Sequence, residues 1–193
     1  MSALPGAKEM TDARSQQIML IDLDSCVRCY ACEVACRQEH HLAVETASRW
    51  CQVVTIEPRR LSGHLHMDFV PVICFHCDDP MCAGVCPAGA VFKEADGSVV
   101  VDQKTCTGCK LCIYACPYGR MFYDEVTGAA GHCDLCAGRV NAGMEPACVQ
   151  HCIGGALQFV AQEELALITK GQHTLHMGKV CYTSSKWRLE GKM

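Results

Sequence analysis

The cysteines of this chain are the residues whose number and spacing indicate a chemical role. Of 193 residues, 18 are cysteine, and sixteen of these form four groups of four. These quartets, numbered one to four along the chain, are Cys26, Cys29, Cys32 and Cys36; Cys74, Cys77, Cys82 and Cys86; Cys106, Cys109, Cys112 and Cys116; and Cys133, Cys136, Cys148 and Cys152. Three thiolates on one tight loop can each bind one iron of a cubane cluster. The quartets therefore predict iron–sulfur chemistry, with all sixteen cysteines as ligands.

The fourth cysteine of each quartet is expected to serve a different cluster from the first three. A fourth cysteine after a gap of three residues, often followed by proline, crosses to the neighbouring cluster in two-cluster bacterial ferredoxins. Pro87 and Pro117 follow two of these cysteines, and proline favours the first turn of a helix, so a helix is predicted to begin there. The swap predicts group A (Cys26, Cys29, Cys32, Cys152), group B (Cys36, Cys133, Cys136, Cys148), group C (Cys74, Cys77, Cys82, Cys116) and group D (Cys86, Cys106, Cys109, Cys112). Each group would hold one [4Fe-4S] cluster.

Zinc and disulfide bonds are the alternative explanations of so many cysteines. Quartet four alone resembles a zinc ribbon, but zinc sites use two CxxC pairs per metal and do not need a third cysteine two residues on. A disulfide framework is expected in secreted chains, and no signal segment is evident here. Cys51 and Cys181 lie outside the quartets, and we expect them to be unligated thiols that pack as small hydrophobic residues.

Residues 69–124 carry the complete pattern of a two-cluster ferredoxin: strand, quartet, hairpin, quartet, strand. The predicted strands of this unit are Phe69–Ile73, Ala90–Lys93, Ser98–Asp102 and Arg120–Asp124. The two middle strands flank Asp96–Gly97, and an Asp-Gly turn between β-rich runs is a strong hairpin signal. The two outer strands are expected to pair with each other.

Quartets one and four must then pair around this inserted unit. Ile18–Leu23 precedes quartet one and Ala156–Val160 follows quartet four, as the outer strands of a second unit should. We therefore predict an α+β fold in which one ferredoxin-like unit is inserted within another. The outer unit comprises residues 18–68 and 125–161, the inserted unit comprises 69–124, and 162–193 form a C-terminal extension.

The remaining segments give shorter predictions. Helices are expected at Ala31–Leu42 and Gln162–Lys170, and a second hairpin at Gln52–Glu57 and His64–Phe69. Gly128–Gly131 should be a turn, because glycine-rich segments between structured runs form loops. From His173 onward, the chain is predicted to be irregular, with one strand near Lys179–Thr183.

Composition excludes several classes of function. The chain has 17 basic and 21 acidic side chains and a net charge of −4, which argues against nucleic-acid binding, because phosphate contacts need clustered Lys and Arg. The longest apolar runs have strand length, far below the roughly 20 residues of a membrane helix, so no direct membrane span is expected. Met1–Gln17 has neither an apolar signal segment nor paired arginines. We expect a cytoplasmic protein, or one that is co-exported with a signal-bearing partner.

No catalytic residue is predicted, because the sequence has no nucleophile paired with a base and no phosphate-binding glycine loop. His76, His132 and His151 stand beside ligand cysteines, but every quartet is already complete, so we expect them to face solvent or to donate an N–H to a sulfur. Bound clusters would carry out one-electron chemistry, and four of them suit a relay between redox partners. A zinc-stabilised interaction module and a self-sufficient enzyme with an open cluster iron are the alternative functions.

Three stretches resemble a known family. They are CFHCDDPMCAGVCPAGAV (Cys74–Val91), CTGCKLCIYACPYG (Cys106–Gly119) and CDLCAGRVNAGMEPACVQHCIGGAL (Cys133–Leu157). Over about residues 18–160, the chain resembles the four-cluster iron–sulfur subunits of the dimethyl sulfoxide reductase family, in which quartets one and four share a domain. In this family, proline often follows the last cysteine, where Ile153 stands here. Because Cys109 keeps the quartet complete, the resemblance implies four [4Fe-4S] clusters.

The resemblance also implies partners. It implies a non-catalytic electron-transfer subunit of an oxidoreductase complex, bound to a large catalytic subunit with a molybdenum or tungsten pterin cofactor. A membrane quinone-reactive subunit or a soluble ferredoxin would be the second redox partner. Related subunits also serve hydrogenases, carbon monoxide dehydrogenase and tungsten benzoyl-CoA or aldehyde-type reductases, so these partners are alternatives.

Overall fold

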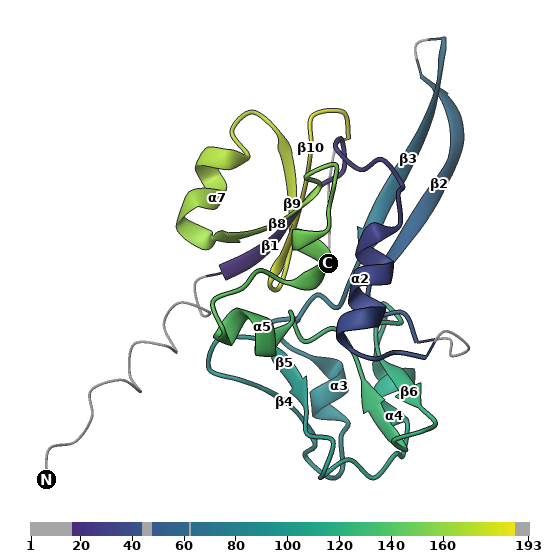
Figure 1. The fold of residues 1–193 in the computed structure, drawn as a ribbon, viewed down its shortest axis with the longest axis vertical. Coiled ribbons are helices and arrows are strands. Elements are labelled where there is room, and N and C mark those ends of the chain that lie inside the picture. Colours follow the sequence, from purple (N-terminus) through teal and green to yellow (C-terminus); the bar gives the residue numbers. More distant parts are fainter. Residues whose placement is uncertain (1–16, 44–47, 62, 188–193) are drawn as a thin grey trace, which may run out of the picture.

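Strands from both ends of the chain form the largest sheet. The computed structural model describes residues 17–43, 48–61 and 63–187. Strand β1 (Gln17–Asp22) lies between β8 (Leu157–Ala161) and β10 (Val180–Ser184), and β9 (His173–Met177) forms the edge beside β10. Strand β1 runs antiparallel to β8 and parallel to β10. The predicted strands before quartet one and after quartet four are confirmed, and they pair directly, which brings these quartets to one side of the sheet (Figure 1).

Three hairpins make up the remaining strands. Strands β2 (Gln52–Leu61) and β3 (His64–Val72) form a long hairpin that projects from the body (Figure 1). The other two are β4 (Val91–Lys93) with β5 (Val99–Val101), and β6 (Phe122–Asp124) with β7 (Ala129–Gly131). The hairpin across Asp96–Gly97 is confirmed, and Gly97 has the positive φ of 84° that such a turn requires.

The predicted pairing of Phe69–Ile73 with Arg120–Asp124 is wrong. The backbone of β3 is instead paired with β2, so that Phe69 lies opposite Thr55. Strand β6 turns back at Gly128, whose φ is +70°, and pairs with Ala129–Gly131. The segment predicted as a turn is therefore a turn only at Gly128, because the residues after it form a strand.

The helices are short. Those around the quartets are α2 (Ala31–Glu39), α3 (Met81–Gly84), α4 (Leu111–Ala115), α5 (Ala137–Asn141) and α6 (Ala147–Gln150), and α7 (Gln162–Ile168) follows β8. The predicted helices at Ala31–Leu42 and Gln162–Lys170 are confirmed, with earlier ends. Within the described residues, no helix has both the length and the apolar character that crossing a bilayer requires. The chain is thus a mixed fold of short helices and strands.

The C-terminal segment is more regular than predicted. Instead of one strand in an irregular tail, it forms the hairpin β9–β10, and β10 is an interior strand of the main sheet. Every residue of β10 is buried, including the polar Thr183 and Ser184. The strand predicted near Lys179–Thr183 is confirmed as β10, whereas its hairpin partner β9 and its interior place in the sheet were not predicted.

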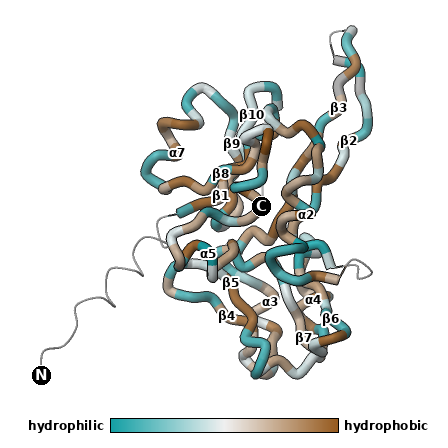
Figure 2. The backbone as a smooth tube through the Cα atoms, viewed as in Figure 1, coloured by the Kyte–Doolittle hydropathy of each residue, from teal (hydrophilic) through white to brown (hydrophobic). Residues whose placement is uncertain are grey.

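Cysteine thiols occupy much of the interior. The main cluster of buried residues combines Met19, Ile21, Val180 and Tyr182 of the sheet with six cysteines: Cys32, Cys36, Cys51, Cys74, Cys133 and Cys148. A smaller cluster packs Cys82 and Cys112 against the hairpin β4–β5. Figure 2 shows hydrophobic residues along β1, while many loops are hydrophilic. A chain with only 6% aromatic residues thus builds its interior around sulfur.

Candidate metal centres

The first two cysteines of every quartet lie on the same type of turn. The residue just before the second cysteine has a left-handed backbone in all four, namely Arg28, His76, Gly108 and Leu135, with φ of 57°, 49°, 69° and 56°. This conformation costs roughly 1–3 kcal/mol for a residue other than glycine, and it clusters at functional sites. Four copies of one strained turn, three of them without glycine, indicate that these loops are built for the same purpose.

The third cysteine occupies the second residue of a helix in every quartet. Cys32, Cys82, Cys112 and Cys148 take this position in α2, α3, α4 and α6, and all four side chains are buried. The helix therefore begins before the third cysteine, and the prediction that helices begin at Pro87 and Pro117 is wrong. Since the helix rises from the third cysteine toward the fourth, it carries the fourth thiol away from the first three.

A tight turn follows the fourth cysteine in quartets two, three and four. The N–H groups of Gly89, Gly119 and Gly155 donate to the carbonyl oxygens of Cys86, Cys116 and Cys152 at 3.2, 3.2 and 3.0 Å. Each of these glycines has a positive φ, which glycine adopts without steric cost. Ile153, which replaces proline, lies in the same turn as Pro87 and Pro117, so its presence does not alter the local fold.

The structure brings the thiols of group A together around one space. Its four cysteines line a single small hollow next to Arg28 and Gly154. Burial raises the pKa of Cys26, and the nearby thiols of Cys32, Cys152 and Cys29 raise it further. The last cysteine of quartet four thus lies with the first three of quartet one.

Groups B, C and D show the same proximity. In group B, burial raises the pKa of Cys133 well above its usual value, with further contributions from Cys36 and Cys148. In group C, burial raises the pKa of Cys74 to about 12, and the other three thiols of the group contribute. In group D, burial and the other three thiols raise the pKa of Cys112. Each group joins three cysteines of one quartet to the fourth cysteine of another.

These groups fit iron–sulfur clusters by the chemistry of their donors. Each offers four thiols, and soft thiolates are the ligands of such clusters. Backbone N–H groups of Arg120, Ala130 and Leu157 donate to the sulfurs of Cys116, Cys106 and Cys152 at 3.3 to 3.4 Å. Hydrogen bonds of this kind stabilise negative charge on sulfur. Because burial keeps many of the free thiols neutral, binding of iron would release their protons.

The groups also lie in a definite order. Besides burial and the thiols of group B, Cys32 of group A raises the pKa of Cys148, so A and B are neighbours. Cys112 of group D likewise contributes to the raised pKa of Cys82 in group C, after burial and the thiols of its own group. Between these pairs, donor atoms of Cys74, His76 and His132 all lie within 4.8 Å of one another. Group C therefore lies next to group B, because Cys74 belongs to group C and His132 directly precedes Cys133 of group B. The groups thus lie in the order A, B, C, D.

The histidine predictions are confirmed in part, since His151 is exposed as expected. His76 and His132 are fully buried rather than solvent-facing: Nδ1 of His76 accepts a hydrogen bond from the Val99 N–H at 2.9 Å, and His132 Nδ1 lies 2.6 Å from the Cys133 carbonyl oxygen. A histidine that was not predicted lies close to a ligand sulfur: His40 Nε2 is 3.3 Å from Cys136 Sγ. Ninety-six residues separate these two in sequence, so spacing alone gave no signal of this contact.

The two cysteines outside the quartets have different surroundings. Cys181 packs against Ile18, Leu20 and Leu165 as a buried hydrophobic residue, as predicted. Cys51 is also buried and packs in the main core cluster beside Cys32 and Cys36, as predicted for a small hydrophobic residue.

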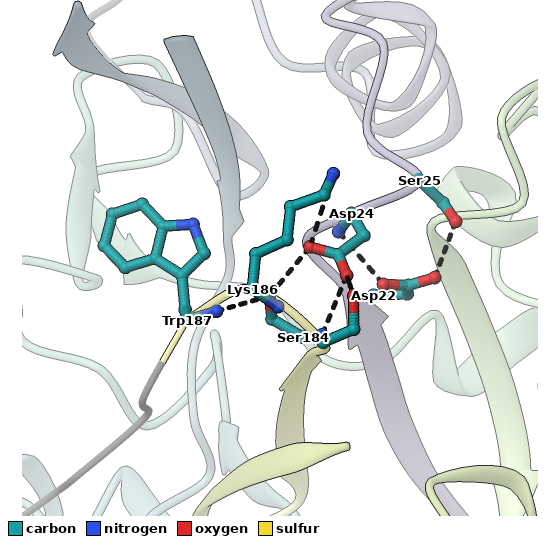
Figure 3. Close-up of polar contacts among 7 residues, drawn as sticks. Asp22, Asp24, Ser25, Ser184, Lys186 and Trp187 are labelled. Atoms are coloured by element: carbon teal, nitrogen blue, oxygen red, sulfur yellow. Dashed lines mark hydrogen bonds and ion pairs between the residues drawn. The ribbon is translucent and has the colours of Figure 1, made fainter. Parts of the chain in front are cut away.

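Aspartates shape the entry to quartets one and three. Asp22 and Asp102 each stand four residues before a first cysteine, and each accepts hydrogen bonds from an N–H two residues on and a hydroxyl three residues on. In quartet one, the next aspartate adds a link to the C-terminal strand: Asp24 accepts from the Ser184 hydroxyl and the Ser185 N–H at 2.7 Å each (Figure 3). The end of β10 is thereby fastened to the loop that enters group A.

Comparison with known proteins agrees with this geometry. The family described as "4Fe-4S dicluster domain" matches residues 65–162. The chain is 42% identical over 146 residues to a subunit of the tetrathionate reductase of Salmonella typhimurium, covering 74% of this chain and 57% of that protein's length.

Two further relatives are covered over more of their length. One polypeptide of the anaerobic dimethyl sulfoxide reductase of Escherichia coli is 38% identical over 156 residues, which cover 78% of this chain and 76% of the relative. The thiosulfate reductase electron transfer subunit PhsB of Salmonella typhi is 40% identical over 157 residues, covering 80% and 81%. The chain therefore belongs to the family of 4Fe-4S iron–sulfur subunits of the dimethyl sulfoxide, tetrathionate and thiosulfate reductases, and its cofactors are four [4Fe-4S] clusters.

Proposed function

We propose that this chain relays single electrons through four [4Fe-4S] clusters held by groups A, B, C and D, to or from the catalytic subunit of a molybdenum or tungsten pterin oxidoreductase. The observation that carries the proposal is the grouping of sixteen thiols in four sets, each set completed by a cysteine from another quartet. When bound, such clusters accept and return one electron each. The chain itself positions the thiols and supplies N–H groups to their sulfurs.

The exposure of the thiols supports a linear relay. Of the eighteen cysteines, all within the described residues, only Cys29 of group A and Cys109 of group D are exposed. These are the two ends of the order A, B, C, D. Electrons would enter at one exposed end and leave at the other, while group B, whose four cysteines are all buried, would lie within the path.

The same grouping supports a nested pair of ferredoxin-like units. Groups A and B use only cysteines of quartets one and four, and groups C and D use only those of quartets two and three. We therefore assign residues 18–68 and 125–161 to the outer unit and 69–124 to the inserted unit. The C-terminal extension, 162–193, would support the outer unit through β10.

The partner follows from the relatives. Three of them are named as parts of reductases that act on tetrathionate, dimethyl sulfoxide or thiosulfate. A catalytic subunit of this kind would meet one end of the relay, and a membrane quinone-reactive subunit or a soluble ferredoxin the other. Co-purification from the native host, followed by identification of the large subunit, tests this assignment.

Metal loading tests the relay itself. After anaerobic reconstitution, the full chain should contain about sixteen irons and sixteen sulfides, and a redox titration followed by electron paramagnetic resonance should show four one-electron steps. Only one or two clusters after complete loading would overturn the relay. Colourless protein that holds zinc and no sulfide would favour an interaction module instead.

Paired substitutions test the ligand groups. If Cys26 and Cys152 serve one cluster, the double variant C26S/C152S should lose about four irons, because both changes disable the same site. The matched double variant C26S/C36S should lose about eight, because its changes fall in groups A and B. The reverse result would show that Cys36 stays with the other cysteines of quartet one.

A further inference from the structure

The loop of group A carries an arginine at the turn position that quartet three fills with glycine. Arg28 has a φ of 57°, and Gly108 stands at the matching position before Cys109. A left-handed residue other than glycine is strained, and such strain is concentrated at functional sites. The two other residues at this position, His76 and Leu135, are buried, whereas Arg28 is exposed. Packing in the interior therefore accounts for His76 and Leu135 but not for Arg28.

Arg28 is held in place by two aromatic rings. Its Nε–H donates to the Tyr30 hydroxyl at 2.6 Å, and its guanidinium carbon lies 5.6 Å from the centroid of the Tyr30 ring and 5.4 Å from that of the Phe69 ring on β3. Among the residues that the structure describes, no carboxylate pairs with it. A guanidinium is a planar fork of N–H groups that matches a carboxylate. Arg28 is thus preorganised to receive an acidic side chain.

Exposed apolar side chains surround this arginine. Val27 and Ile153 are 60% and 78% exposed. Their loops touch, because a Cβ on Gly154 would lie 3.6 Å from Val27 Cγ2. Arg28 and Gly154 line the same small hollow as the four thiols of group A. The two apolar side chains and the cation therefore form one surface over this group, beside the exposed Cys29.

The hairpin β2–β3 extends this surface away from the body. Side chains alternate between the two faces of a strand, so Leu65 and Met67 lie on the same face of β3 as Phe69. Leu65 and Met67 are 68% and 43% exposed, and the exposed Arg60 of β2 lies opposite Leu65. The hairpin is a two-stranded sheet that projects from the body (Figure 1), and such a sheet is only marginally stable by itself in water. The surface thus continues along the hairpin as an apolar stripe, with Arg28 at its base and Arg60 near its tip.

We propose that this surface binds a protein redox partner that exchanges electrons with the chain at group A. The proposal deepens the relay function and rests on it, because the surface surrounds one exposed end of the relay. One electron would cross it at a time, and one protein is oxidised as the other is reduced. The group A surface consists of Val27, Arg28, Arg60, Leu65, Met67 and Ile153.

The composition of the group A surface defines the chemistry of its partner. Methionine and arginine are enriched at the cores of protein interfaces, and an arginine held in a fixed position is typical of the residues that dominate binding energy. Because both arginines are positive, the partner surface should carry carboxylates among apolar side chains. A second copy of this chain is the alternative occupant, which the test below distinguishes.

The chain supplies a matched control at the other end of the relay. Lys110 stands beside the exposed Cys109 of group D, has a φ of 64°, and places its Nζ 3.8 Å from the centroid of the Tyr123 ring. Arg28→Gly and Lys110→Gly therefore each remove a cation held by an aromatic ring and each relieve a strained turn, since glycine adopts a positive φ without steric cost. The two variants differ in the end of the relay that they change.

The test measures binding to the anaerobically loaded full chain in wild-type, R28G, L65S/M67S and K110G forms. The probes are the proteins that co-purify with the wild-type chain and exchange electrons with it. For one probe, R28G and L65S/M67S should each weaken binding about tenfold or more, whereas K110G should leave the binding of that probe unchanged. R28G should keep about sixteen irons and should not unfold at a lower temperature than the wild type.

Other results would overturn the proposal. If R28G weakened the binding of no probe, or if R28G and K110G weakened the same probe equally, the group A surface would not be the docking site. Loss of iron or earlier unfolding in R28G would show that Arg28 only supports its loop. A dimer of the isolated loaded chain that dissociates in L65S/M67S would assign the surface to a second copy. Failure of the wild type to show four reducible clusters would instead count against the relay.

Discussion

Groups B and D each consist of four thiols, but the two sets lie in opposite surroundings. All four cysteines of group B are buried, whereas in group D only Cys112 is buried and Cys109 is exposed. Burial raises the pKa of Cys133 and Cys148 in group B well above the usual value. For Cys86 in group D, burial is the largest single influence and raises the pKa, but hydrogen bonds from four backbone N–H groups together outweigh it, so the pKa is lowered.

The source of the burial differs as well. Group B shares its core cluster with Val180 and Tyr182 of β10, so residues far along the chain cover it. Cys112 of group D packs against Val91, Val99 and Met121, which all lie within about twenty residues of it in the sequence. The difference shows that group B is part of the main folding core, whereas group D lies at the surface on a locally built support.

The largest expected effect comes from removing one ligand in each group. Cys133→Ala should destabilise the chain by several kcal/mol, because the energy of metal binding is folding energy where the ligands form the core. Cys109→Ala is the matched change at the surface, and it should cost about four irons with little change in the thermal unfolding of the rest. Iron analysis and circular dichroism on heating check both variants. Equal destabilisation would contradict the contrast between the groups.

The turn between β9 and β10 provides a second test, because it determines how β10 reaches group B. A Cβ on Gly178 would lie 2.3 Å from the His76 carbonyl oxygen and 2.4 Å from that of Phe75, and the φ of Gly178 is +56°. Gly178→Ala must therefore displace the loop of quartet two as well as strain its own backbone. We expect a lower unfolding temperature and faster loss of iron to a chelator.

Gly171 is the control for this substitution. Its φ is +82°, but a Cβ there would meet nothing within 4 Å. Gly171→Ala should thus cost only the strain of a left-handed residue, about 1–2 kcal/mol. If the two variants released iron at the same rate, the close approach of Gly178 to the loop would have no part in holding the clusters.

The ligand set could be predicted from the sequence because cluster chemistry fixes local spacing. Cysteines three residues apart give a CxxC loop in any fold, and Asp96–Gly97 gives a hairpin from turn chemistry alone. The contact of His40 with a ligand sulfur could not be predicted, because it depends on how α2 and quartet four pack together. The position of β10 was equally hidden, since its parallel pairing with β1 joins Met19 to Val180.

The link from Asp24 to the end of β10 gives a third, smaller effect. Asp24→Ala removes the acceptor of the fully buried Ser184 hydroxyl and of the Ser185 N–H, and a buried donor left without an acceptor costs about 1–3 kcal/mol. Lys104 stands at the equivalent position before Cys106 and is exposed, so Lys104→Ala should leave stability nearly unchanged. Chemical denaturation of the loaded protein measures both. A loss of stability in K104A equal to that in D24A would show that β10 is not held through this carboxylate.

The smallest expected effect concerns the side-chain donor of group B. His40 Nε2 lies 3.3 Å from Cys136 Sγ and 3.6 Å from Asp134 Oδ1, and in the tautomer with the proton on Nε2 its N–H points at these two acceptors. His40→Phe keeps a ring against Trp50, whose ring centroid is 4.6 Å away, but removes the N–H. One midpoint potential should therefore fall by about 30–59 mV, while His41→Asn, a change at the adjacent residue, should leave all four in place. Four unchanged midpoints in H40F, or an equal fall in H41N, would show that the N–H of His40 does not act on a cluster.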